Sequence, residues 1–203
     1  MPVDPDSVLR QVEAHLLSLL GQDSGRAGVS FLGAERIDVL RFGPDPDGVV
    51  RYATVGMSRA PMGDPAAELV LADGPRAELL LSVRDRHDSV LRRLAVLAAS
   101  PAVEGVVLAA GAGLDLGEPL WDASPFTAVL LGEPGGLVPD LVLPDDGGVD
   151  VRELVRFLPV LPMTPNEAAW KRVHGARALE QRWLERATDL RDARRAEVDL
   201  TPC

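Results

Sequence analysis

Ser58 is the residue whose type and setting come closest to nucleophilic chemistry, because Gly-Met-Ser-Arg-Ala (residues 56–60) resembles a nucleophile elbow. In an elbow the serine stands on a sharp strand-to-helix turn, and a histidine takes its proton. Ala60 stands where the elbow has its last glycine, and Pro61 prevents a helix directly after the turn. All three histidines are expected on helices or at helix edges, namely His15, His87 and His174. We therefore interpret Ser58 as a turn residue that bonds to local backbone, with a serine hydrolase as the alternative.

Residues 105–117 (Gly-Val-Val-Leu-Ala-Ala-Gly-Ala-Gly-Leu-Asp-Leu-Gly) are the best candidate for a cofactor site. An apolar strand that runs into Gly-Ala-Gly resembles the start of a dinucleotide-binding turn. The third glycine of that pattern comes one residue late, at Gly117, and Glu118 and Pro119 do not open a helix that could hold a pyrophosphate. We expect a plain strand and turn here, and no cofactor.

The remaining acidic and imidazole side chains do not indicate a metal site or a pair of catalytic carboxylates. No two histidines have the spacing that places two ligands on one face of a helix or strand. Asp45 with Asp47, and Asp145 with Asp146, lie in Gly- and Pro-rich turns, where hydrogen bonds to local backbone favour aspartate. We expect neither a metal ion nor a catalytic residue.

Met57 and Met62 bracket a proline-containing loop that follows a predicted strand. A flexible thioether exposed in such a loop would suit adaptable protein binding. Packing of the loop against the core explains the two methionines equally well, so the sequence leaves both interpretations open.

The chain of 203 residues carries 31 acidic and 21 basic side chains, a formal net charge of −10. A surface of that sign repels phosphate backbones, so we expect no nucleic-acid partner. The single cysteine, Cys203, cannot form an intramolecular disulfide, which fits a reducing compartment. The N-terminus lacks the features of a signal peptide, and no apolar run approaches bilayer length. We therefore expect a cytoplasmic protein without a membrane partner.

Hydrophobic spacing and turn residues divide the first half of the chain into helix, meander and helix. Asp6 is placed to cap an amphipathic helix that ends at Gly21, and residues 22–29 are expected to form a loop. Alternating apolar residues predict strands at residues 37–42, 49–57, 68–72 and 77–83. A helix with an apolar stripe is expected over residues 85–99, ended by Pro101.

In the second half, prolines exclude long helices from residues 103–160 and favour short strands at 126–131, 137–143 and 154–161. Thr164 and Glu167 predict a capping box with Pro165 at the first helical position, so a helix must begin there. Gly175 is expected to interrupt it before a second helical run to about Leu190. This segregated order of elements favours one α+β domain over a doubly wound parallel sheet.

Taken in order, these features resemble the suppressor-of-fused domain family in its compact bacterial form. The resemblance covers residues 37–200, and its most specific parts are Gly-Met-Ser followed by Pro-Met and Glu-Leu-Val-Leu, and the helix start Pro-Met-Thr-x-x-Glu. The structural residues of this pattern are Gly56, Pro61, Glu68, Thr164 and Glu167. Arg59 stands where members often carry aspartate, and Asp192 with Arg195 is the best match to a terminal Asp-x-x-Arg pattern.

The resemblance implies a mixed, largely antiparallel β-sheet flanked by helices in a single domain over residues 31–200, preceded by an N-terminal helix and loop over residues 1–30. It also implies a non-enzymatic, protein-binding role. Animal members hold a transcription factor of the Hedgehog pathway in the cytoplasm by capturing an extended peptide as an added strand. Bacterial relatives are proposed as immunity proteins of polymorphic toxin systems. This chain lacks the second domain that helps animal members hold their peptide, so that partner is not carried over.

The leading hypothesis is a cytoplasmic, non-enzymatic immunity protein that binds another protein. That partner is expected to be a basic toxin attracted by the acidic surface, or an extended peptide that joins the sheet edge. The residues expected to contact it are Tyr52, Met57, Ser58, Arg59 and Met62. The alternatives are the hydrolase using Ser58 and a small-molecule sensor or structural subunit. The sequence leaves open the partner's identity, the oligomeric state and the role of the N-terminal helix.

Overall fold

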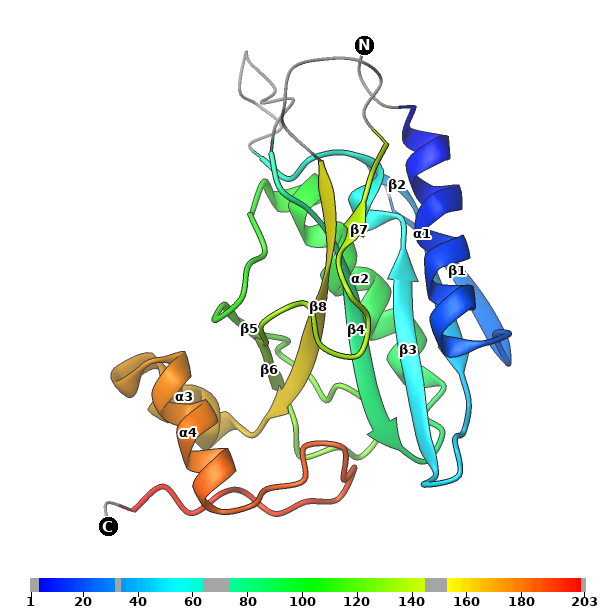
Figure 1. Ribbon diagram of the computed structural model, residues 1–203. Helices are drawn as coiled ribbons and strands as arrows, with labels where there is room; N and C mark the ends of the chain where they lie inside the picture. The colour runs from blue at the N-terminus through cyan, green and yellow to red at the C-terminus, as the bar shows by residue number, and fades with distance from the viewer. Residues whose placement is uncertain (1–3, 32–33, 64–73, 145–152, 202–203) are drawn as a thin grey trace.

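The computed structural model describes residues 4–31, 34–63, 74–144 and 153–201, which form an eight-stranded sheet with four α-helices (Figure 1). The strands are β1 (Gly25–Phe31), β2 (Ala34–Phe42), β3 (Val49–Val55), β4 (Arg76–Arg84), β5 (Gly113–Asp115), β6 (Ala128–Leu131), β7 (Leu141–Val142) and β8 (Leu154–Met163). The helices are α1 (Pro5–Leu20), α2 (Ser89–Glu104), α3 (Pro165–His174) and α4 (Ala176–Glu185), with one 3-10 turn, η1 (Met57–Arg59).

The sheet has the strand order β1-β2-β3-β4-β8-β6-β5, and β7 pairs with β8 beside this path. Every neighbouring pair is antiparallel except β4 with β8, which runs parallel. The fold is therefore α+β with a mixed, largely antiparallel sheet, as the sequence predicted. β2, β3 and β4 form the expected antiparallel meander, which β1 extends at one edge, and the chain reaches β8 only after α2 and three short strands.

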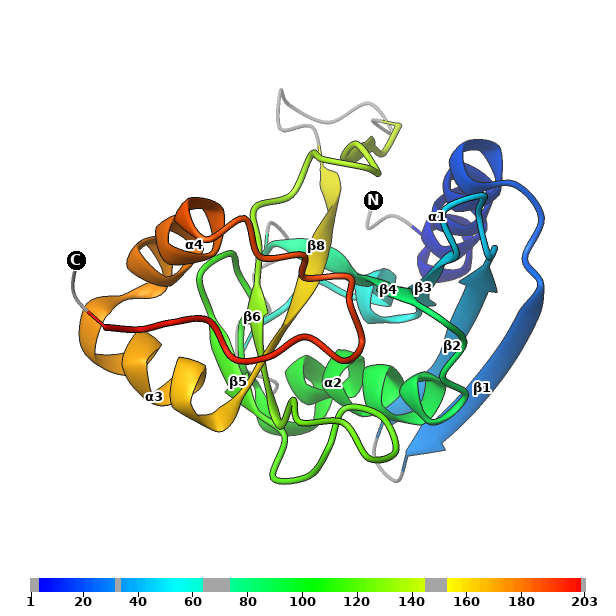
Figure 2. The same cartoon turned by 90° about the horizontal axis from the view of Figure 1, so that it is seen from below.

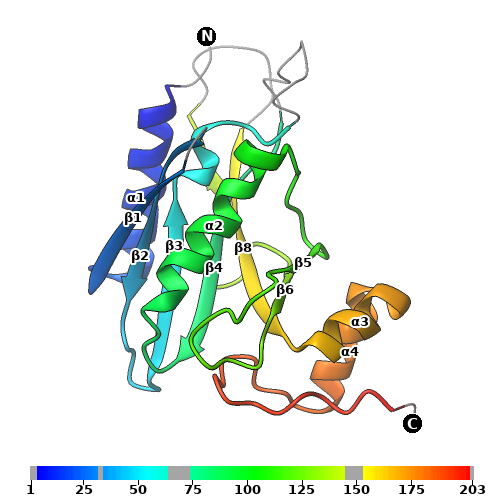
Figure 3. The ribbon, with the colours of Figure 1, turned by 180° about the vertical axis from the view of Figure 1, so that it is seen from behind.

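One helix covers each face of the sheet (Figures 1 and 3). Successive strand residues point to opposite faces, so β2, β3, β4 and β8 each contribute to two separate hydrophobic clusters. On one face Val12 and Leu16 of α1 pack in a cluster with Phe42 of β2. On the other face Leu94 of α2 packs in a cluster with Leu81 of β4. The N-terminal helix thus packs on the sheet of its own chain.

The helices α3 and α4 form a small layer at the end of β8, and the C-terminal segment returns from them along the sheet (Figure 2). Thr164 and Glu167 form the predicted capping box, with Pro165 at the first helical position. Gly175 separates the two helices at a φ of 90°. Leu179 and Trp183 of α4 are buried against β6 and β8 in a third cluster. The predicted break is confirmed, although α4 ends at Glu185 rather than near Leu190.

The structure corrects two expectations near the N-terminus. Residues 22–29 are not a loop throughout, because β1 begins at Gly25 and pairs with β2. The cap of α1 is Asp4 rather than Asp6, since the Asp4 side chain accepts from the amides of Asp6 and Ser7. Both differences lengthen the regular structure, and β1 becomes an edge strand of the sheet.

Pro101 does not end α2, which continues to Glu104. A proline inside a helix lacks the amide that would bond to the carbonyl four residues earlier, here Leu97. The hydroxyl of Ser100 donates to that carbonyl oxygen at 2.8 Å instead. Because a side chain satisfies the freed acceptor, the helix passes through the proline and stops one turn later at Gly105.

Other expectations fall on irregular or undescribed parts of the chain. The predicted strand of residues 105–109 is an irregular connection, and the next strand, β5, has only three residues. Of the predicted strand at residues 137–143, only β7 is a strand. The predicted strand at 68–72, with Glu68, and the acidic pair Asp145 and Asp146 lie outside the described residues. Within the described ranges, no helix is both long and apolar enough to cross a bilayer.

Candidate protein-binding site

The predicted binding loop follows β3 as the turn η1, which packs against α1 and α2. Arg59 is half-buried and pairs with Asp6 of α1, Nη1 to Oδ1 at 2.8 Å. The other four residues of the prediction are buried, namely Tyr52, Met57, Ser58 and Met62. Of the two interpretations of the methionines, the structure shows core packing. A partner could contact Met57, Ser58 and Met62 only after the loop rearranged, and Tyr52 lies within β3, so the binding role of all four stays a prediction.

Glu78 of β4 explains why this loop is buried. Its side chain is fully buried, and its carboxylate accepts from the hydroxyls of Thr54 and Ser58, both at 2.6 Å. It also accepts from the amides of Gly56 (2.9 Å) and Ser58 (3.0 Å). The φ of Gly56 is 146°, a backbone conformation that favours glycine and allows the amide to point at the carboxylate. Four donors thus satisfy a charge that would otherwise be costly to bury.

Arg76, two residues before Glu78, fixes the other side of the same loop. Its Nη1 donates to the carbonyl oxygens of Ser58 (2.8 Å) and Arg59 (2.9 Å), and its Nε pairs with Glu153 at 3.0 Å. The side chain of Arg76 is 7% exposed. One strand therefore holds both the amides and the carbonyls of the turn, which makes the loop a rigid part of the fold.

Ser58 is not arranged as a nucleophile. Its hydroxyl donates to a buried carboxylate, and its side chain has no exposed surface. The three histidines have other neighbours: His15 bonds to Pro139, while His87 stacks on Trp121 and His174 on Trp170. Across the described ranges none of them forms a hydrogen bond with Ser58. The sequence interpretation is corrected in one respect, because Ser58 bonds to the side chain of Glu78 and not to local backbone.

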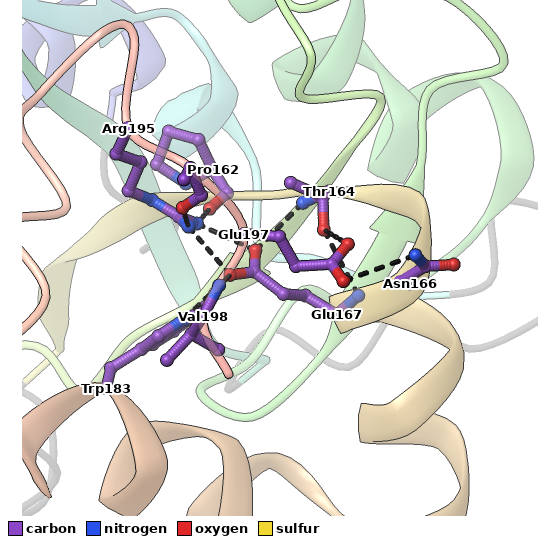
Figure 4. Close-up of polar contacts among 9 residues, drawn as sticks. Pro162, Thr164, Asn166, Glu167, Trp183, Arg195, Glu197 and Val198 are labelled. Carbon is purple, nitrogen blue, oxygen red and sulfur yellow. Dashed lines mark hydrogen bonds and ion pairs between the residues drawn. The ribbon is translucent and has the colours of Figure 1, made fainter. Parts of the chain in front are cut away.

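Glu167 lies at the centre of a second buried network, at the start of α3 (Figure 4). Arg195 binds its carboxylate with two hydrogen bonds of 2.7 Å, from Nη1 to Oε1 and from Nη2 to Oε2. The same carboxylate accepts from the amides of Thr164 (2.9 Å) and Val198 (3.1 Å) and from Nε1 of Trp183 (3.2 Å). Burial acts to raise the pKa of Glu167, but the bonds from Arg195 and Thr164 outweigh it and hold the pKa below 4.5.

Arg195 carries this network from α3 to the strands. Its Nη2 also donates to the carbonyl of Pro162 in β8 at 2.7 Å, and its guanidinium lies 4.7 Å from the ring centroid of Phe126. Glu197 completes the network by accepting from the hydroxyl of Thr164 at 3.0 Å. The terminal Asp-x-x-Arg match pointed to Arg195, yet nothing in the sequence paired it with Glu167.

A groove of about 120 Å³ lies between β4 and β8 on the face of the sheet that carries α1. Its floor is mostly apolar, with Ser82 as the polar exception among residues that also include Leu80, Phe157, Pro159 and Leu161. One wall is the connection that precedes β7, at residues 136–138, and the other is Leu190 with Arg191 of the C-terminal segment. Sequence reasoning missed this groove, because its floor and walls come from four distant parts of the chain.

The groove exists because β4 and β8 stop pairing before either strand ends. They pair only over residues 76–80 and 155–159, although β4 continues to Arg84 and β8 to Met163. The C-terminal segment bridges the far end of the gap, where the amide of Arg84 donates to the carbonyl of Arg191 at 2.7 Å. Asp189 of this segment pairs with Arg84; burial acts to raise its pKa, but hydrogen bonds from Arg191 and Arg84 lower it to about 2.

The described ranges contain no candidate metal site, because no three His, Cys, Asp or Glu side chains in them are grouped closely enough to hold an ion. The two buried carboxylates are saturated with protein donors, so neither is free to act on a substrate. What the arrangement offers is an apolar groove between two strands, lined also by residues 136–138 and by the C-terminal segment.

Comparisons with known proteins agree on one family. The family model for suppressor of fused protein (SUFU) matches residues 33–196. A search of curated proteins found no match. Among solved structures, a SUFU homolog from Neisseria gonorrhoeae FA 1090 is 19% identical with a TM-score of 0.71, covering 97% of this chain and 100% of that one. The Sufu–Fu complex matches at 11% identity and a TM-score of 0.63, covering 97% of this chain and 92% of the other. Drosophila Suppressor of Fused matches at 12% identity and a TM-score of 0.64, and the match covers 97% of this chain and 51% of the Drosophila chain.

Proposed function

The chain belongs to the suppressor of fused (SUFU) family, and from this membership we propose that it is a non-catalytic module that binds another protein. The partner would present an extended segment, and the segment would lie in the groove between β4 and β8. The Sufu of the Sufu–Fu complex binds another protein, which supports a protein partner for this chain as well. The sealed position of Ser58 argues against the alternative of a serine hydrolase.

The observation that carries the proposal is the early end of the β4–β8 pairing. Beyond Leu80 and Pro159 the two strands continue without pairing to each other. An extended segment gains affinity from backbone hydrogen bonds to such strands and specificity from pockets for alternate side chains. The mostly apolar floor of the groove would bury one face of the segment, which adds the hydrophobic contribution that backbone bonds alone lack.

We further propose that the chain acts in the cytoplasm as an immunity protein that neutralises a toxin. The formal net charge of −10 would speed association with a basic protein such as a toxin that acts on nucleic acid. Neighbouring genes test this role cheaply. A toxin or secretion cassette beside the gene would support it, whereas a metabolic operon would favour a small-molecule sensor instead.

Affinity capture from the native organism tests the docking place. Ser82 lies half-buried on the groove floor and bonds to neither buried network, so Ser82→Trp would fill the groove. Val96→Trp is the matched control, because Val96 is exposed on α2, which covers the opposite face of the sheet. We expect one partner to be recovered with the wild type and with Val96→Trp, and lost with Ser82→Trp. Repeated capture that recovers no partner would contradict the binding role, and full recovery with Ser82→Trp would contradict the groove.

A further inference from the structure

One wall of the groove is a short connection, residues 133–140 (Glu-Pro-Gly-Gly-Leu-Val-Pro-Asp), which we call the strap. In Figure 1 it is the yellow-green loop that hangs below β7, in front of the sheet and beside α1. The strap enters the groove wall through Gly136, Leu137 and Val138. Its position means that any segment lying in the groove would touch it.

The strap connects Gly132, whose amide donates to Pro159 at 2.8 Å, to β7, and within the strap itself only the C-terminal half is fixed. Val138 is 1% exposed and packs in the cluster beneath α1. Its neighbour Pro139 accepts a hydrogen bond of 2.8 Å at its carbonyl oxygen from Nε2 of His15. Within the described residues this is the only hydrogen bond that joins the strap to another element. The C-terminal half of the strap is therefore fixed by the buried side chain of Val138 and by the hydrogen bond from His15.

The N-terminal half of the strap has the opposite character. Gly135 has a φ of 84°, and a Cβ added at Gly135 or Gly136 would have no neighbour within 4 Å. Leu137 follows directly and is 52% exposed, although it borders an apolar groove. Two unpacked glycines give the backbone freedom to turn, and an exposed leucine beside an apolar floor lacks the partner that would cover it.

His15 connects the strap to the floor of the groove. Its ring lies 5.5 Å, centroid to centroid, from the ring of Phe157, which lines the groove in β8. The same imidazole bonds to Pro139 in the strap and belongs to α1. His15 thus links α1 to both the strap and the floor of the groove. A displacement of Phe157 would therefore also displace the hydrogen bond between His15 and Pro139.

From this arrangement we propose that the strap is a clamp that closes on a segment bound in the groove, with Leu137 as the gripping side chain, Gly135 and Gly136 as the hinge, and His15 as the latch. The inference rests on the proposed function of the groove. It assigns α1 a role as the support of the latch. The clamp also requires that the strap open and close while the sheet stays folded. This motion does not need a bound partner, so it should occur in the isolated protein.

NMR relaxation dispersion of the isolated protein tests that requirement. We expect the amides of residues 135–138 to report exchange with an open state on the μs–ms timescale while those of β6 do not, because the strap opens locally. His15→Ala should raise the population of the open state about fivefold, the effect of losing one hydrogen bond, while β6 stays in a single state. Gly136→Ala should lower that population about two- to fivefold, because alanine restricts the open state. His174→Ala, on α3, is the control and should leave the strap unaffected.

Three results would overturn the clamp. Strap amides that show no such exchange would show that the strap does not open while the sheet stays folded. An unchanged population of the open state in His15→Ala would remove the latch, and a larger one in Gly136→Ala would remove the hinge. These measurements use no partner, so their failure leaves the docking proposal standing.

The contact made by Leu137 is tested separately, by a further variant in the affinity capture. Leu137→Ala should reduce recovery of the partner that Ser82→Trp loses, while Val103→Ala, at a residue 54% exposed on α2, should not. Loss with Ser82→Trp but full recovery with Leu137→Ala would overturn the clamp and keep the groove. Full recovery with both variants would overturn the groove itself.

Discussion

Replacing Glu167 by glutamine should lower the free energy of unfolding substantially, because it leaves a buried cation without its counter-charge. The Glu167 side chain has no exposed surface and that of Arg195 is 5% exposed. Glutamine keeps the shape of the carboxylate but loses the charge. It also turns one acceptor oxygen into a donor that faces the donors already present.

The magnitude follows from the contacts that remain. Breaking a buried ion pair by removing one partner costs about 3–5 kcal/mol. The carbonyl of Pro162 and the ring of Phe126 still contact Arg195 in the variant, so we expect the lower half of that range. For a chain of this size, 3–4 kcal/mol corresponds to a fall in melting temperature of roughly 6–16 °C.

Urea unfolding at several pH values is the assay. The pKa of Glu167 is below 4.5 in the folded protein, so its carboxylate stabilises the fold fully above that pH. As the pH falls through the folded pKa, Glu167 takes up a proton and the contribution is lost. The gap between wild type and Glu167→Gln should therefore be widest near neutral pH and narrow below pH 4.5.

A control and a second variant make the reasoning refutable. Glu104→Gln, at an exposed residue at the end of α2, should change stability little. Adding Arg195→Met to Glu167→Gln removes the orphaned cation and should recover part of the loss. If the double variant is instead as unstable as the sum of the two single variants, the pair is not coupled and the argument fails.

Three further predictions concern the local devices of the fold. Ser58→Ala should cost about 1.5–3 kcal/mol in urea unfolding because Glu78 loses a charged hydrogen bond; a fluorophosphonate probe should leave wild-type Ser58 unlabelled, and labelling would revive the hydrolase. Gly56→Ala should cost about 1–3 kcal/mol by the same assay, since its φ is unfavourable for alanine; an unchanged melting temperature would contradict this. Ser100→Ala should cost about 1 kcal/mol, but almost nothing in a Pro101→Ala background, where the restored amide bonds to the same carbonyl; equal losses in both backgrounds would refute the compensation.

The parts of the fold that the sequence predicted correctly depend on the types and spacing of residues close together in the chain. The capping box at Thr164 involves residues three apart, and the break at Gly175 depends on one residue. The meander follows from alternating apolar residues and turn signals between neighbouring strands. Such patterns carry their own geometry, so they can be recognised without knowing the rest of the chain.

The errors have physical causes of two kinds. β1 has two glycines in seven residues and lies at an edge, so it lacks the apolar alternation that marks a strand with a buried face. Pro101 was expected to stop α2 because a proline alone stops most helices, and the compensating hydroxyl of Ser100 is a detail of side-chain geometry. In each case the tertiary or local context overrides a preference that is correct on average.

The candidate site was largely unpredictable because its contacts span the chain. Glu78 lies 20 residues from Ser58, and Arg195 lies 28 residues from Glu167. An isolated glutamate in a strand or a helix start gives no sign of its partner. The family resemblance pointed to Gly56 and Glu167 as structural residues, but not to the carboxylate that holds Gly56.

The buried carboxylate of Glu167 has a consequence for the groove. Strands that pair throughout their length fix their own spacing, whereas β4 and β8 pair over only five residues each. Their spacing beyond that point must be set from outside the ladder. At the far end the C-terminal segment spans the gap, from the amide of Arg84 in β4 to the carbonyl of Pro162 in β8. Glu167 holds that segment in place through Arg195, so the ion pair sets the width of the groove and its loss should weaken binding as well as stability.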